Sequence, residues 1–193
     1  MQIKTSTLGL LFTLTILSGP SAYSAGNDNE KTLPQLQSDL VKIEKSIDVT
    51  RKKMKEVRDV TFLPDLYFIL AENYVEKSRY LYTINRQKNK NLPLNEIDFS
   101  DSLKAKKQAI EVYQRFIETF PKNNQVDKAH FFMAHEYRET GNNEEMVKIY
   151  LKLTKEFTQS PFWEESQLIL GDFFLEQKKD PKMALEFYQK ILE

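Results

Sequence analysis

The sequence predicts an all-α protein: one helix with a heptad repeat, followed by an α-solenoid of about three stacked helical hairpins. Residue types recur after 37 or 38 positions, as Tyr113, Tyr150 and Tyr188 show. Seven Pro and five Gly are few for 193 residues, which favours helix. Apolar residues early in the chain alternate spacings of three and four. A repeat of this length indicates units that bury their apolar faces only against their neighbours.

Residues 1–25 have the pattern of a secretion signal. Lys4 provides a positive start, residues 8–17 are almost wholly apolar, and small residues follow for cleavage before Ala25. The alternative is a membrane anchor, which is disfavoured because ten residues of helix span only about 15 Å. We therefore expect a periplasmic protein, exported across the inner membrane, with no stable membrane insertion after signal cleavage. A disordered linker is expected over 26–32.

Charge and cysteine content exclude several classes of function. Lys plus Arg and Asp plus Glu both number 28, so no overall field recruits nucleic acid or anionic lipid. The absence of Cys excludes disulfides, thiolate zinc sites, a Cys nucleophile and the lipid anchor of a lipoprotein. His130 and His135 are five apart on a helix, so they face different ways and cannot chelate one metal. We expect no enzyme activity, no cofactor and no metal site.

Residues 33–61 are predicted to form the heptad helix. Its apolar stripe consists of Leu33, Leu36, Leu40, Ile43, Ile47, Thr50, Met54 and Val57. Two alternatives are open for this stripe. It could form a short coiled coil that makes a homo-oligomer through residues 33–60, with Leu36, Leu40, Ile43, Ile47, Met54 and Val57 in contact. It could instead fold back as one more helix against the repeats.

Residues 64–193 are predicted to form the solenoid. A first helix precedes a polar and basic loop insertion at 85–100, and Pro121 marks a later turn. The expected helices are Leu66–Tyr82, Leu103–Phe120, Val126–Thr140, Glu144–Phe157, Phe162–Gln177 and Pro181–Leu192. We expect no strand.

The repeat pattern resembles tetratricopeptide repeats (TPR), whose units pair two antiparallel helices. The middle unit is matched by Met133, Ala134, Tyr137, Met146, Tyr150 and Leu153. The last is matched by Leu170, Gly171, Phe174, Ala184, Tyr188 and Ile191. The first is matched by Leu70, Ala71, Tyr74, Ala109, Tyr113, Phe116 and Pro121. Ala71 and Ala109 are 38 apart where the middle unit has 12, so the first unit carries 26 additional residues.

The resemblance implies a right-handed solenoid whose first helices line a concave, protein-binding face. By position, the partner-binding residues would be Phe68, Glu72, Val75, Phe131, His135, Arg138, Leu168, Asp172 and Leu175. The TPR variety that clamps a C-terminal carboxylate uses Lys and Asn at such places. Phe68 and Glu72 stand there instead, so that ligand is disfavoured.

An exported heptad helix followed by such repeats is similar to the periplasmic coiled-coil–TPR factors of the cell envelope. The resemblance implies a non-enzymatic adaptor that binds protein partners among cell-envelope components. One alternative is the non-catalytic N-terminal module of a longer cell-wall enzyme. Another is a periplasmic chaperone for outer-membrane proteins.

Two further features have more than one interpretation. Trp163 is the only tryptophan and could anchor a partner or fix the entry to a helix. Arg79, Arg86, Lys88 and Lys90 make the insertion basic, as a solvated loop or as a contact for an acidic partner or peptidoglycan.

Overall fold

The computed structural model describes residues 31–192, which form α-helices and two short 3-10 turns with no strand in that range. The all-α prediction is confirmed. The predicted signal peptide and residues 26–30 of the predicted linker lie outside the described residues. Lys31 and Thr32 belong to the folded part, since the Thr32 N–H donates to Gln35 Oε1 (2.8 Å) at the start of the first helix. No described helix is long and apolar enough to cross a membrane.

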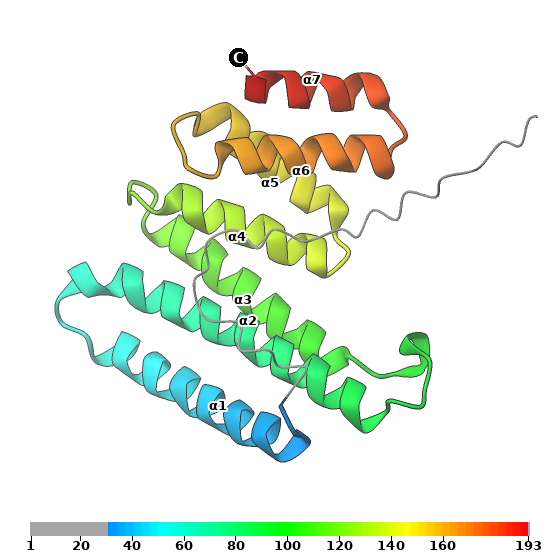
Figure 1. Ribbon diagram of the computed structural model, residues 1–193. Helices are drawn as coiled ribbons and strands as arrows, with labels where there is room; N and C mark the ends of the chain where they lie inside the picture. Colours follow the sequence, from blue (N-terminus) through cyan, green and yellow to red (C-terminus); the bar gives the residue numbers. More distant parts are fainter. Residues whose placement is uncertain (1–30, 193) are drawn as a thin grey trace, which may run out of the picture.

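The helices follow one another as a stack in which each packs mainly on its neighbours in sequence (Figure 1). The stack starts with α1 in blue and ends with α7 in red. The elements are α1 (Leu33–Glu56), η1 (Val60–Phe62), α2 (Leu63–Lys88), η2 (Leu94–Glu96), α3 (Ser100–Thr119), α4 (Val126–Glu139), α5 (Asn143–Glu156), α6 (Trp163–Glu176) and α7 (Pro181–Leu192). Helices α2–α3, α4–α5 and α6–α7 form the three hairpins, as the repeat pattern predicts.

Helix α1 packs along α2 through its heptad stripe. Leu36, Ile47 and Thr50 are buried, and the other stripe residues are half-buried. Leu36 lies in a cluster with Tyr80 and Ile84 of α2. The structure therefore agrees with the fold-back alternative. An oligomer built on Leu36, Leu40, Ile43, Ile47, Met54 and Val57 would have to displace α2.

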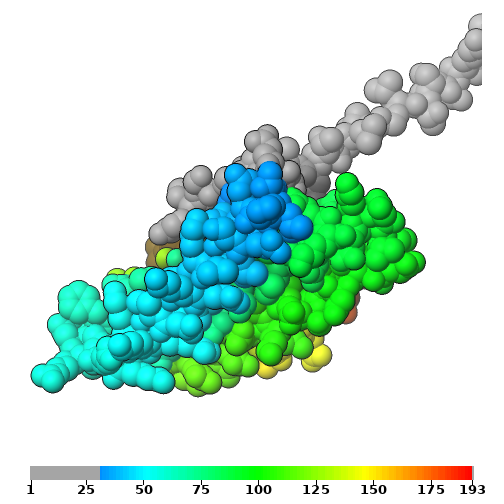
Figure 2. Space-filling view, turned by 90° about the horizontal axis from the view of Figure 1, so that it is seen from below, coloured from blue at the N-terminus to red at the C-terminus, as the bar shows by residue number. Residues whose placement is uncertain are grey.

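The heptad helix is shorter than the predicted range of 33–61, because α1 ends at Glu56. The Asp59 carboxylate accepts hydrogen bonds from the Thr61 N–H (3.0 Å) and hydroxyl (2.6 Å). These bonds cap the turn η1, which redirects the chain into α2. Figure 2 shows α1, blue to cyan, covering this end of the solenoid, with the cyan segment projecting at one side.

The predicted loop insertion at 85–100 is only partly a loop. Helix α2 continues to Lys88 and α3 begins at Ser100, so the additional residues mainly lengthen the first hairpin. The prediction was wrong at Asn85–Lys88 because contacts distant in sequence stabilise this polar stretch as helix. The Gln87 side chain donates to the Lys31 carbonyl (3.1 Å), and the Asn85 side chain donates to the Asp98 carbonyl (2.8 Å).

The second and third hairpins are compact. Gly141 has a φ of 77°, the left-handed conformation that favours glycine at a helix C-terminus, and it closes the turn between α4 and α5. Gly171 lets α6 approach α7 closely, since a Cβ there would overlap the Tyr188 ring. Ala134 occupies the corresponding position in α4 and is fully buried. The small residues of the repeat pattern therefore set the distance between paired helices.

Candidate partner-binding surface

The nine residues predicted to bind a partner lie on α2, α4 and α6, but they are not equally accessible. The exposed ones are Glu72, Arg138, Leu168, Asp172 and Leu175, and Val75 and His135 are half-buried. Because each of these helices is covered by its neighbours on other sides, the exposed residues mark the surface that remains open. This surface is the candidate site.

Phe68 and Phe131 do not belong to that surface, which corrects the prediction at these two positions. Both are buried, at 5% and 4% exposed. The Phe68 ring packs edge-on against Phe116, with ring centres 4.8 Å apart. Phe131 stacks on Phe162 at the start of α6, at 4.7 Å. These rings hold neighbouring helices together and are not available to a partner.

Helix α6 carries the most regular part of the surface. Leu168, Asp172 and Leu175 follow at spacings of four and three, which places them on one face of the helix. The two leucines are 47% and 43% exposed. The Asp172 carboxylate accepts a hydrogen bond from the Tyr188 hydroxyl (2.7 Å), so α7 fixes its orientation. We call Leu168, Asp172 and Leu175 the α6 row.

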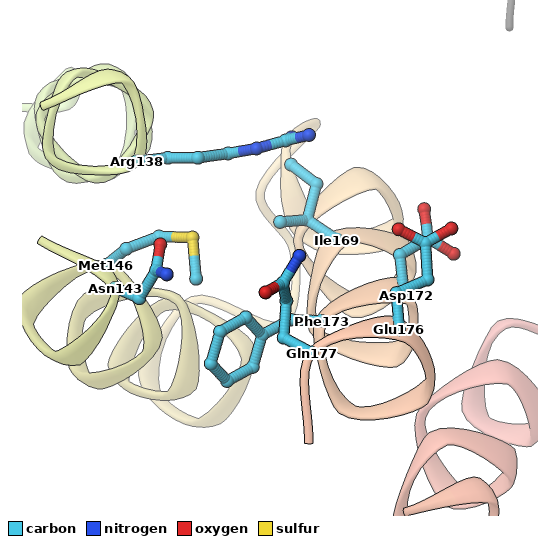
Figure 3. A pocket seen from close by; sticks show the side chains of 8 residues that line it. All are labelled: Arg138, Asn143, Met146, Ile169, Asp172, Phe173, Glu176 and Gln177. Carbon is cyan, nitrogen blue, oxygen red and sulfur yellow. The ribbon is translucent and has the colours of Figure 1, made fainter. Parts of the chain in front are cut away.

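A small pocket of about 90 Å³ lies where the ends of α4 and α6 meet the start of α5. In Figure 3, Arg138 extends from α4 toward Ile169, while Asp172 and Glu176 lie together on α6. Ligand pockets for small molecules are several times larger, so this one suits a single side chain of a partner. Its lining is Arg138, Asn143, Met146, Ile169, Asp172, Phe173, Glu176 and Gln177.

An ion-pair network next to this surface ties α3 to α4. Lys106 of α3 lies 3.5 Å from the buried Glu136 carboxylate and 3.6 Å from Glu139. His135 lies 3.6 Å from Glu136 on its other side. Burial alone would raise the pKa of Glu136, but His135 and Lys106 outweigh it and hold that pKa below its usual value. Glu136 is therefore an ionised, paired group with a structural role.

The two histidines of α4 have different surroundings. His130 is buried against Phe157, with ring centres 5.7 Å apart, and neither of its nitrogens has a hydrogen-bond partner. Burial, with a smaller contribution from Lys152, lowers its pKa to about 4, against an opposing effect of Asp127. His135 is at the surface. In residues 31–192, no group of three or more His, Asp or Glu side chains could hold a metal ion.

Trp163 fixes the entry to α6. Its indole N–H donates to the Thr154 carbonyl near the end of α5, at 2.9 Å, and the side chain is half-buried. Of the two alternatives for Trp163, the structure therefore agrees with the one in which it fixes the entry to a helix. In the basic segment Arg79 lies 3.5 Å from Glu76, and the other cations are exposed. Contact of that segment with an acidic partner stays a prediction.

The acidic residues Glu176 and Glu165 were not identified from the sequence. Nor were the amide side chains of Asn143 and Gln177, which line the pocket. Glu176 follows Asp172 by four positions and lies beside it in the pocket. That spacing could have identified it. Glu165 is half-buried in the first turn of α6, and burial raises its pKa, against an opposing effect of His135. No pattern in the sequence signals Glu165, because its environment depends on how α4 and α6 pack.

Comparison with known proteins supports the repeat assignment. A tetratricopeptide repeat model matches residues 65–123, which span α2 and α3 with the additional residues between them. A second tetratricopeptide repeat model matches 127–156, which span α4 and α5. No curated protein matches the chain. Tetratricopeptide repeats generally mediate binding to protein partners. The described residues thus form an all-α, TPR-like solenoid whose first two hairpins match tetratricopeptide repeats.

Proposed function

We propose that this protein is a non-enzymatic adaptor, exported to the periplasm, that binds protein partners of the bacterial cell envelope. The observation that carries the proposal is the α6 row, in which two exposed leucines flank an oriented carboxylate. The row lies on the third hairpin, which continues the stack formed by two hairpins that match a protein-binding repeat family. The secretion pattern of residues 1–25 supports the location.

The α6 row and the neighbouring pocket offer complementary chemistry. Leu168 and Leu175 provide apolar contact area, and Asp172 and Glu176 provide negative charge. Arg138 lies across the pocket and can pair with a carboxylate of the partner. This combination suits an amphipathic helix or an extended peptide laid along the surface.

Partner capture with matched variants tests the adaptor function. The variant L168E/L175E should lose the partners that the unchanged chain captures from envelope extracts, by at least about tenfold. The control is L151E, which places one such charge on an exposed leucine of α5 (40% exposed). Capture that the α6 variant leaves unchanged would exclude this surface as the binding site.

The number of captured proteins separates the adaptor from the chaperone alternative. A crosslinker at residue 168 should attach to one or two proteins if the chain is an adaptor. A chaperone would yield many unrelated outer-membrane proteins at the same position. A broad set of products would therefore overturn the adaptor proposal and favour the chaperone.

Fractionation tests the location. The chain with residues 1–25 present should reach the periplasmic fraction and lose these residues, whereas a form lacking residues 1–25 should stay in the cytoplasm. Mass spectrometry of the purified periplasmic protein gives its N-terminus. An N-terminus upstream of residue 8 would show that the apolar segment is retained.

A further inference from the structure

The end of α1 and the turn after it combine exposed cations with exposed apolar side chains. Five of the eight residues from Arg51 to Arg58 are cationic, and only Glu56 is acidic. The turn η1 follows, and its Val60 and Phe62 are 66% and 60% exposed. Among the described residues, Phe62 is the only phenylalanine that is exposed; the others are half-buried or buried. We name the following set the basic corner: Lys52, Lys53, Lys55, Arg58, Val60 and Phe62.

The cations of the basic corner are largely unneutralised. Lys53, Lys55 and Arg58 form no ion pair with another residue of the described part, and all are exposed. Lys52 lies 3.9 Å from Glu56, but both side chains are mostly exposed, so water screens this pair. A local positive field therefore remains on a chain whose net charge is zero.

The turn that carries the two apolar side chains is fixed. Asp59 directs its carboxylate to the Thr61 N–H and hydroxyl, at 3.0 and 2.6 Å. These hydrogen bonds lower the pKa of Asp59, so the group stays ionised and engaged with the turn. Val60 and Phe62 are consequently held at the surface by a capped 3-10 turn, and their exposure is part of the fold.

The two kinds of side chain together identify the partner. Cations alone would suit any polyanion, including nucleic acid, but such a partner leaves Val60 and Phe62 exposed to water. An anionic bilayer uses both, because apolar side chains enter the headgroup region while Lys and Arg pair with lipid phosphates. We propose that the basic corner binds the surface of an anionic phospholipid bilayer. The contact is peripheral and needs no spanning helix.

The position of the basic corner is compatible with simultaneous protein binding. It lies at the α1 end of the stack, and the α6 row lies toward the other end (Figure 1). The segment that contains it projects from the body in Figure 2. The protein can thus contact a membrane while α6 stays accessible. The lipid contact does not rest on the proposed adaptor function, since none of its residues belongs to the α6 surface.

Vesicle binding tests the inference directly. Residues 26–193 are used, because the apolar segment at 8–17 would bind lipid by itself. The chain should sediment with vesicles that contain about 30% phosphatidylglycerol in phosphatidylcholine and not with pure phosphatidylcholine. Binding should weaken when salt is raised from about 50 to 200 mM.

Two corner variants separate the contributions of charge and apolar contact. K53Q/K55Q/R58Q should bind the anionic vesicles about 100-fold more weakly, since each cation near the surface contributes about fivefold. V60S/F62S should bind at least about tenfold more weakly. The control K104Q/K107Q/K122Q removes the same charge from exposed positions elsewhere and should change binding little. All three sets of substituted side chains are exposed, so the variants should melt like the unchanged chain.

Several results would overturn the inference. Equal loss in the control and the corner charge variant would show a response to net charge only. Undiminished binding by V60S/F62S would exclude insertion of the turn. Failure to bind anionic vesicles would exclude the lipid contact. If that failure accompanies a concentration-dependent mass increase that V60S/F62S abolishes, the corner is a contact between copies of the chain.

Discussion

The first and second hairpins share one repeat pattern but differ in length. Helices α2 and α3 have 26 and 20 residues, whereas α4 and α5 have 14 each. In the second hairpin Gly141 turns the chain immediately after α4. In the first, both helices continue beyond the repeat and close through a loop at 89–99. Buried Ile97 and the stacked rings of Tyr82 and Phe99, 4.5 Å apart, hold this extension together.

The greater length of the first hairpin matches the length of α1. A helix of 24 residues needs a partner of similar length to cover its stripe, and a 14-residue helix would leave half of it exposed. Leu36 is fully buried against Tyr80 and Ile84, and Ile84 lies in the extension of α2. The heptad helix and the 26 additional residues, which are separate irregularities in the sequence, are therefore two halves of one packing unit.

The largest predicted effect comes from a substitution that disrupts the packing of α1 on α2. Leu36→Ala should lower the free energy of unfolding by about 3 kcal/mol, because it removes a fully buried leucine from the contact between α1 and α2. Val41→Ala, at a position 64% exposed on the same helix, should cost less than about 0.5 kcal/mol. Urea unfolding measures both, and limited proteolysis should show cleavage in α1 first. Equal effects would mean that α1 is not held by its stripe.

The elements that the sequence predicts well are those with local determinants. The bounds of α4 to α7 were expected within one residue, because Gly141, Pro181 and the apolar period are visible within a few positions. The end of α2 was not, because Gln87 is stabilised as helix by Lys31, 56 positions away. A polar stretch gives no local sign of such a partner. Likewise, the sequence predicts the stripe of α1 residue by residue, but it leaves two alternatives open for what covers the stripe.

For the candidate site, repeat position indicates which face of a helix a residue occupies, but it does not predict whether the side chain is buried. Repeat position predicts that Leu168, Asp172 and Leu175 bind a partner, and all three are exposed on α6. The same rule placed Phe131 there, yet Phe162 covers it. Phe162 precedes α6 in the segment after α5, and its conformation depends on how two hairpins meet. A periodic pattern determines the side of a helix that a residue occupies. Its burial also depends on residues, such as Phe162, that do not belong to the repeat pattern.

A second test concerns the close approach of α6 and α7 in the third hairpin. Gly171→Ala should cost about 2 kcal/mol, because its Cβ would meet the Tyr188 ring and displace it from the hydrogen bond with Asp172. In the background Tyr188→Ala the same substitution should cost much less. Thermal unfolding of the four chains gives the coupling energy. Additive effects would contradict the close contact of α6 and α7.

A third test uses the position four residues before the small residue of each first helix. It is Tyr67 in α2, His130 in α4 and Gln167 in α6. Tyr67 packs on Phe120 as His130 packs on Phe157. Of the three, only His130 is an imidazole. Its pKa is about 4 in the fold and 6.5 in the unfolded chain, so the unfolded state takes up the proton first as pH falls.

Stability should therefore decrease by about 1 to 2 kcal/mol between pH 6.5 and 4.5, because partial solvent screening reduces the full effect of the pKa shift. His130→Phe should remove this step, because a phenylalanine fills the site without a titrating group. The lowered pKa of Glu136 contributes stability that is lost as pH falls from around 4.5 through the folded pKa, and this loss is common to both chains. Urea unfolding across this range measures the difference between them. His135→Gln, at the surface, should keep the step.

The smallest predicted effect concerns a hydrogen bond between α2 and α3 in the long first hairpin. The Ser102 hydroxyl of α3 donates to the Ser78 carbonyl of α2 at 2.8 Å, and both residues are buried. Ser102→Ala should cost about 1 kcal/mol. The matched change is Ser166→Ala, because Ser166 is as buried but donates within its own helix, to the Phe162 carbonyl at 2.7 Å. That carbonyl keeps its backbone bond from the Ser166 N–H (3.0 Å), so the cost should be about 0.5 kcal/mol or less.

The two serines differ in whether a bond joins two helices or lies within one. A larger loss at Ser102 in urea unfolding would show that a polar contact contributes to holding the long first hairpin closed. Equal losses would mean that apolar packing of Ile97 and of the Tyr82–Phe99 stack is sufficient to close the first hairpin. Closure by apolar packing would make the extension resemble the regular hairpins, where buried apolar and small residues fill the contact between paired helices.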